Sequence, residues 1–124
     1  MQVFKSKWFQ KWAASEGLDD GALLAAVEEM ESGLIDARLG GHVIKKRVAL
    51  PGRGKRGGSR TLVVYQQADK AFFVYGFAKN ERANISDKEL KALKLLATEL
   101  LSYTKPALTK AIKAGELIEV YEDD

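Results

Sequence analysis

Residues 43–77 decide the fold, and they read VIKKRVALPGRGKRGGSRTLVVYQQADKAFFVYGF. Segments rich in β-branched or aromatic residues predict three strands, at 43–50, 60–67 and 71–77. The short connection around Asp69 predicts a hairpin between the second and third strands. The longer connection, 51–59, is rich in glycine, so we expect a long loop that projects into solvent.

Helical patterns precede these strands. Residues 3–4 predict a short opening strand, after which Ser6 caps a helix that ends at Gly17. A second helix is capped at residues 19–20 and ends at Gly33. The first helix carries an apolar stripe at helical spacing, formed by Trp8, Phe9, Trp12 and Ala13. This spacing favours core packing over a base-stacking platform.

Helical patterns also follow the strands. Ser86 and Glu89 have the spacing of a capping box and open the strongest helix of the chain. Pro106 interrupts this helix, and residues 107–114 predict a short one closed by Gly115. The acidic last residues predict a final strand or a docked tail. Segregated helices and strands indicate an α+β fold: a small twisted antiparallel sheet of about four strands, with N-terminal and C-terminal helices packed on it.

Charge is concentrated in one part of the chain. Residues 38–60 contain eight Lys or Arg, no carboxylate, and six of the eleven glycines. The remaining residues carry 12 basic and 17 acidic side chains, a net charge of −5, whereas the whole chain has +3. A local positive patch of this kind attracts polyanions, because each Lys or Arg that neutralises a phosphate releases condensed counterions. The charge pattern therefore points to nucleic acid.

Composition excludes several classes of site. The chain of 124 residues has no cysteine, which rules out disulfides, cysteine-ligated zinc and thiol catalysis. Its single histidine, His42, leaves no histidine cluster for a metal and no histidine pair for acid–base chemistry. There is no membrane-span pattern and no secretory signal. We therefore expect a single cytoplasmic domain over residues 1–124.

Strand alternation predicts which basic residues meet. Within 43–50, Lys45 and Arg47 point to one face and the apolar Ile44 and Val48 to the other. Arg60 begins the next strand, so three cations are expected on one face without carboxylates. A functional anion site is the interpretation, and a solvated sheet face is the alternative.

Two further groups of basic residues flank this cluster. Arg53, Lys55 and Arg56 lie in the glycine-rich loop, where they suit close contact with a sugar–phosphate backbone or belong to a solvated hairpin loop. Lys79 and Arg82 lie in the turn that follows the last central strand. His42 stands alone, which favours a buffering or structural role over catalysis.

These residues carry a family resemblance. The run IKKRVALPGRGKRGGSRTLVVY at 44–65 and the run FFVYGFAKNERANIS at 72–86 resemble the RelE/HigB toxins of bacterial type II toxin–antitoxin systems. The resemblance extends over nearly the whole chain and implies a twisted antiparallel sheet backed by helices. It also implies a toxin that cleaves mRNA on the ribosome and is inhibited by an antitoxin encoded beside it.

The resemblance also implies site residues. Lys45 and Arg47 match the paired basic residues of the central strand, and Arg60 matches the arginine that opens the next strand. Lys79 and Arg82 match the basic turn before the last helix. Two departures from the family pattern are Asn80, where some relatives have arginine, and the absence of a tyrosine at residues 85–86. Residues 104–124 extend beyond a minimal toxin of this family.

The resulting hypothesis is a metal-independent endoribonuclease without a cofactor, because RNA supplies its own 2′-OH nucleophile. Arg47, Arg60 and Arg82 stabilise the oxyanions, and Lys45 is the candidate base, since crowding by like charges lowers the pKa of a lysine. The RNA backbone is held by Lys46, Arg53, Lys55, Arg56 and Lys79.

Partners and alternatives follow from this hypothesis. The expected partners are mRNA, the ribosome and a cognate antitoxin, with a toxin–antitoxin hetero-oligomer as the inhibited form. Three alternatives stay open: a ParE-like toxin that inhibits DNA gyrase, an inactive relative that only binds the antitoxin, and a plain RNA-binding domain. The acidic tail, residues 116–124, is a further candidate because it suits occupation of the basic patch as a built-in mimic.

Overall fold

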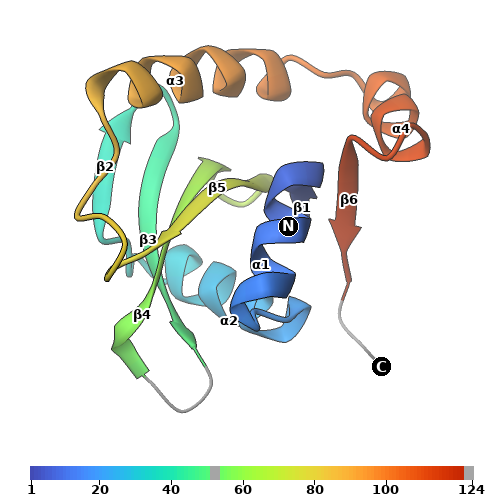
Figure 1. Cartoon of the computed structure of the whole chain (residues 1–124). Helices are drawn as coiled ribbons and strands as arrows, with labels where there is room; N and C mark the ends of the chain where they lie inside the picture. The colour runs from blue at the N-terminus through green and yellow to red at the C-terminus, as the bar shows by residue number, and fades with distance from the viewer. Residues whose placement is uncertain (51–53, 122–124) are drawn as a thin grey trace.

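The computed structural model describes residues 1–50 and 54–121 of the chain. Within these residues ten elements follow one another, with helices before and after the central strands (Figure 1). They are β1 (Gln2–Ser6), α1 (Lys7–Glu16), α2 (Asp20–Glu31), β2 (Ala37–Gly40), β3 (Val43–Leu50), β4 (Gly54–Gln66), β5 (Lys70–Ala78), α3 (Asp87–Leu101), α4 (Lys105–Lys113) and β6 (Leu117–Val120). In this part of the chain no helix combines the length and apolar character needed to cross a bilayer.

The strands form one sheet in the order β2-β3-β4-β5-β1-β6. The α+β class is confirmed, but the expected sheet of about four antiparallel strands is wrong in two respects. The described strands number six, and the sheet is mixed because β1 pairs parallel with β5. The additional strands, β2 and β6, are each four residues long. β2 pairs with β3 across a turn, and β6 pairs with β1, which is distant in sequence.

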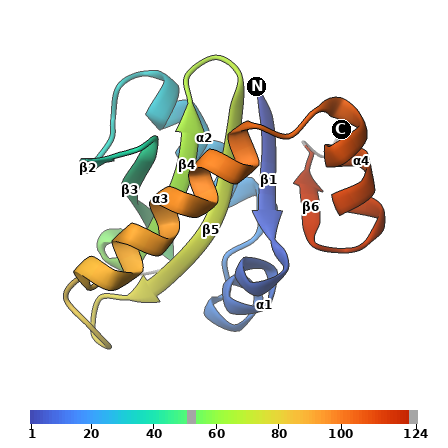
Figure 2. The same cartoon turned by 90° about the horizontal axis from the view of Figure 1, so that it is seen from above.

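Helices cover both faces of the sheet (Figures 1 and 2). One core lies between the sheet and helices α1 and α2, and it includes Phe9, Leu23 and Phe73. The other lies beneath α3 and α4, and it includes Phe72, Ala97 and Leu108. Strands buried on both sides explain why residues 62–65 read as a continuous run, LVVY, rather than as an alternating pattern.

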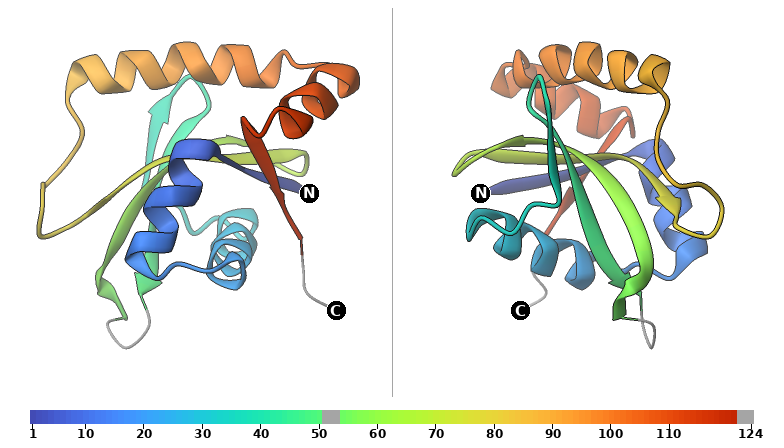
Figure 3. Two further views of the ribbon diagram at one scale, coloured as in Figure 1. Left: turned by 45° about the vertical axis from the view of Figure 1, so that its right-hand side comes forward. Right: turned by 90° about the vertical axis from the view of Figure 1, so that its left-hand side faces the viewer.

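The β3–β4 hairpin differs from expectation. β4 begins at Gly54, whereas the sequence predicts a loop from 51 to 59. Leu50 pairs with Gly54, so backbone pairing with β3 extends the strand through glycines that have little intrinsic preference for it. Residues 51–53 lie outside the described residues. The described parts of β3 and β4 extend away from α3 (Figure 3).

Local capping determines where the helices begin. The side chains of Ser6 and Asp19 accept hydrogen bonds from the backbone at the start of α1 and α2, as predicted. Ser86 and Glu89 form the predicted capping box of α3. Pro106 does not interrupt that helix, because α3 has already ended at Leu101 and the proline occupies the first turn of α4.

Candidate nucleic-acid interface

Lys45, Arg47 and Arg60 lie on one face of the sheet, as the strand alternation predicts. Lys45 pairs with Leu62, whose side chain belongs to the core beneath α3. Arg47 pairs directly with Arg60 across the β3–β4 ladder. Side chains directly opposite each other in antiparallel strands have Cβ atoms about 5 Å apart, so the two arginines leave neighbouring strands at one level of the ladder. Like charges placed in this way repel unless an anion lies between them or beside them.

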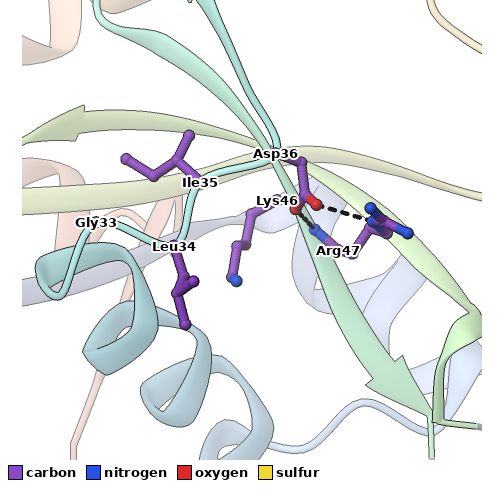
Figure 4. A pocket seen from close by; sticks show the side chains of 6 residues that line it. All are labelled: Gly33, Leu34, Ile35, Asp36, Lys46 and Arg47. Atoms are coloured by element: carbon purple, nitrogen blue, oxygen red, sulfur yellow. Dashed lines mark hydrogen bonds and ion pairs between the residues drawn. The ribbon is translucent and has the colours of Figure 1, made fainter.

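Arg47 has an anionic partner that the sequence did not predict. The Asp36 carboxylate accepts hydrogen bonds from Arg47 Nε at 2.8 Å and from the Arg47 backbone N–H at 2.5 Å (Figure 4). Burial opposes ionisation of Asp36, but the hydrogen bonds and charge of Arg47 outweigh it and lower the pKa of this carboxyl. The expected carboxylate-free cluster is therefore wrong at Arg47, although its side chain is still 45% exposed.

Arg60 differs from Arg47. Its side chain is half-buried, and Nη1 is shielded from solvent without a hydrogen-bond partner in the structure described. An unsatisfied buried donor costs about 1–3 kcal/mol, and more when it is charged. Arg60 is thus the arginine of this face whose guanidinium is least satisfied by the described residues.

A β-bulge shapes the neighbouring strand. Phe73 pairs with Val63 and Tyr75 pairs with Leu62, so Val74 is an extra residue in β5. Phe73 packs beneath α1 and α2, whereas Tyr75 faces the other side of the sheet with Leu62. The bulge therefore turns the following side chains toward the face that carries the arginines.

Phe77 is the next residue on this face and links two arginines. It pairs with Arg60 across the β4–β5 ladder, and Arg82 Cζ lies 5.6 Å from the centre of its ring. This contact is a cation–π interaction. Lys45, Arg47, Arg60 and Arg82 consequently belong to one surface, which we call the basic face.

Arg82 is held by several partners. Its Nη1 and Nη2 donate to the two oxygens of Glu89 at 3.0 and 2.5 Å, and Nε donates to the Asn84 carbonyl at 2.9 Å. The Arg82 guanidinium and the Ser86 N–H lower the pKa of Glu89 to about 2. Arg82 is therefore oriented by a bidentate ion pair, and its charge is partly offset.

The residues that were predicted to hold the RNA backbone occupy different environments. Lys46 faces α2, is 3% exposed, and forms an ion pair with Glu29 at 2.9 Å. It is therefore not part of the basic face, because the alternation that exposes Lys45 buries its neighbour. Lys79 is exposed in the turn after β5. Arg53 and the side chains of Lys55 and Arg56 lie outside what the structure describes.

Other sequence candidates lie away from this face. His42 is exposed in the turn between β2 and β3, where its φ is 65°. Residues 117–120 of the acidic tail form β6 beside β1, at the opposite edge of the sheet from β2 and β3. Leu117 and Val120 are buried there, so this part of the tail does not cover the basic face. Residues 122–124 lie outside the described range.

The sequence comparison decides the family. A family model described as the RelE toxin of the RelE / RelB toxin–antitoxin system matches residues 1–120. The chain belongs to the RelE toxin family. It is therefore a toxin component of a toxin–antitoxin system, with a cognate antitoxin as partner. No curated protein sequence gives a significant match.

Sequence reasoning missed three features of this RelE-family toxin. Asp36 precedes a four-residue strand that has no pattern of its own, so its contact with Arg47 was not foreseeable. Glu89 was recognised in its capping box, but not as the partner of Arg82. Trp8 was assigned to the core, yet it is 46% exposed and stacks on Tyr75. Trp8 lies at the margin of the apolar stripe, one residue before the buried Phe9, and this position was the sequence feature that indicated its exposure.

Proposed function

We propose that this RelE-family toxin is an endoribonuclease that cleaves mRNA on the ribosome without a metal ion. The observation that supports this most directly is the cross-strand pair Arg47–Arg60, with Arg60 Nη1 lacking a hydrogen-bond partner among the described residues. Guanidinium groups that arise from directly paired positions of two neighbouring strands suit the non-bridging oxygens of a phosphodiester.

RNA contributes the nucleophile of this reaction. The 2′-oxygen attacks the adjacent phosphorus, and its proton passes to Lys45. The bond from phosphorus to the 5′-oxygen of the next nucleotide breaks, and that oxygen takes up a proton from water. The products are a 2′,3′-cyclic phosphate and a 5′-hydroxyl end. Arg60 and Arg47 stabilise the charge that develops on the phosphorane, which is the contribution expected of preorganised donors. Arg82 adds positive potential from its fixed position beside Phe77.

A non-catalytic role is the second candidate, and one observation favours it. Arg47 and Arg82 each have a carboxylate partner, Asp36 and Glu89, so half of the four cations are already paired. A surface of this kind suits binding of RNA or of an acidic antitoxin segment without chemistry.

Induction of the toxin without its antitoxin tests the proposal. We expect growth arrest and translation-dependent mRNA cuts, and we expect Arg60→Ala and Lys45→Ala each to reduce cleavage about 10²- to 10³-fold. Lys113→Ala, which removes an exposed charge from α4, is the matched control and should retain activity. Circular dichroism and thermal unfolding verify that each variant folds.

The outcomes separate the candidate functions. Cleavage in vitro that persists with a chelator supports the metal-independent reaction. Growth arrest with intact mRNA and DNA damage would instead assign gyrase inhibition. RNA binding that is lost in Arg60→Ala, with no cleavage by the unaltered protein, would assign the non-catalytic role.

A further inference from the structure

Tyr75 lines a pocket that the proposed cleavage chemistry does not use. The pocket lies between β5 and α3, has a volume of about 220 Å³, and is lined by Tyr75, Glu89, Ala92, Leu93 and Leu96. Its walls are largely apolar, with the carboxylate of Glu89 as the charged group at its margin. A flat apolar ligand with a polar edge matches such a lining.

The Tyr75 ring is held in place from the side of α1. Its centre lies 4.8 Å from that of Trp8, with 27° between the ring planes, and Trp8 in turn stacks with Trp12 at 6.2 Å. Trp12 is itself close to Gly76, where an added Cβ would lie 2.3 Å from the indole. The aromatic stack is therefore fixed by packing, so a planar ligand on Tyr75 meets a surface that needs little further ordering.

The pocket is continuous with the basic face. Arg82 Nη1 lies 3.4 Å from the Tyr75 hydroxyl and is also bound to Glu89. Tyr75 and Phe77 are two residues apart on one strand, a separation of about 7 Å, and Phe77 pairs with Arg60. The aromatic surface and the cations are thus neighbours along one face.

We propose that this pocket binds a nucleobase of the RNA, stacked on Tyr75, while the adjoining phosphate lies on the basic face. The inference rests on the proposed function, because it takes the polyanion on this face to be an RNA strand. The Tyr75 ring can stack on any base, because every base has a π-face. The polar edge of the stacked base then lies near Arg82 and Glu89. The neighbouring cations favour a nucleotide over an apolar side chain of the antitoxin, since an apolar side chain has no group to pair with them.

The test uses a 2′-O-methyl oligoribonucleotide that contains one 2-aminopurine. Because its 2′-oxygens are blocked, binding is measured without cleavage. The full-length toxin should quench the 2-aminopurine fluorescence by stacking. Tyr75→Leu should abolish the quenching and weaken binding about 5- to 150-fold, whereas Tyr75→Phe, which keeps the ring, should retain both. The salt dependence of binding should not change, since the phosphate contacts remain.

A strand with an abasic site at the same position is the second control. On this strand the unaltered protein and Tyr75→Leu should bind equally. If Tyr75→Leu does not fold, Ala92→Leu partly fills the pocket from an exposed position of α3 and should reduce quenching in its place.

Equal binding of the base-containing strand by the unaltered protein and Tyr75→Leu would overturn the inference. So would a loss of antitoxin binding in Tyr75→Leu with unchanged RNA binding, which would assign the pocket to the antitoxin. Cleavage of unmodified RNA is measured in parallel. Tyr75-dependent quenching without cleavage supports the base site and refutes the nuclease. Cleavage without Tyr75-dependent quenching supports the nuclease and refutes the base site.

Discussion

Arg60 and Arg82 both lie beside Phe77, but their surroundings give them different properties. Arg82 is held by Glu89 in a bidentate ion pair, which fixes the guanidinium before any ligand arrives. Arg60 has a buried nitrogen without a partner in the structure as described. The difference predicts that substitution of Arg60 affects anion binding most, whereas substitution of Glu89 first affects the position of Arg82 and the stability of the fold.

The Arg82–Glu89 pair predicts a pH dependence of stability. The pKa of Glu89 falls from 4.5 to about 2 in the folded protein, so the stabilisation is complete above pH 4.5 and is lost as the pH falls toward 2. Urea unfolding of the toxin and of Glu89→Gln over this pH range measures it. Gln retains the capping-box geometry but not the charge, so the stability difference should be largest at neutral pH and vanish near pH 2.

Glu99→Gln is the matched control for this measurement. Glu99 is exposed on the same helix, and the described residues offer it no ion pair. Its substitution should alter stability little at any pH. A difference between the toxin and Glu89→Gln that stays constant down to pH 2 would contradict the assigned role of the ion pair.

At the scale of elements, the path of β5 determines the composition of the site. The bulge at Val74 puts Tyr75 and Phe77 on the face of α3, and it leaves Gly76 on the face of α1. Glycine is needed there because Trp12 approaches the strand closely. The same packing supports the aromatic stack on Tyr75.

We therefore expect Gly76→Ala to destabilise the protein. An added Cβ would lie 2.3 Å from Trp12, and overpacking of this kind costs about 1–3 kcal/mol in the free energy of unfolding. Gly21→Ala makes the same chemical change in α2, where the nearest atom is 3.4 Å away, and it should be neutral or stabilising. Chemical denaturation of both variants measures the contrast, and similar effects at the two positions would argue against close packing of α1 on β5.

At the scale of the whole molecule, the basic face and the lysines of α4 are distinct regions. Arg82 of the basic face binds Glu89 in the first turn of α3, whereas α4 follows the last turn of that helix (Figure 1). The helix α3 has 15 residues, so its two ends are separated by roughly 22 Å along its axis. Lys105, Lys110 and Lys113 of α4 are exposed, as is Arg47, and a simple count of charge does not distinguish the two regions. The basic face contains the arginine pair and adjoins the Tyr75 pocket, whereas α4 does not line that pocket.

The salt dependence of RNA binding distinguishes the two regions. Replacing Lys45, Arg47 and Arg60 together by glutamine should reduce the log–log salt slope by about two units, because each lost contact to single-stranded RNA contributes about 0.7. The same replacement at Lys105, Lys110 and Lys113 should reduce it less. Binding is measured on an uncleavable strand. An equal reduction by the α4 variant would place the RNA on both regions.

Sequence alone determined the parts of this protein that depend on neighbouring residues. The spacing of Ser86 and Glu89 predicts the start of α3, because a capping box closes within one turn. The alternation in β3 places Lys45 and Arg47 together, because successive side chains of a strand point to opposite faces. The runs of β-branched and aromatic residues located β3 and β5, to within a residue at each end for β5.

Tertiary structure decided what depends on residues far apart in the chain. The start of β4 at Gly54, the parallel pairing of β1 with β5, and the ion pair of Lys46 with Glu29 each require a partner that local patterns do not identify. The bulge at Val74 follows from registry with β4, and a shift of one residue changes the face of every side chain that follows. Arg47 and Arg82 acquired carboxylate partners for the same reason: an ion pair depends on which surfaces meet, and folding brings Asp36 and Glu89 to the basic face.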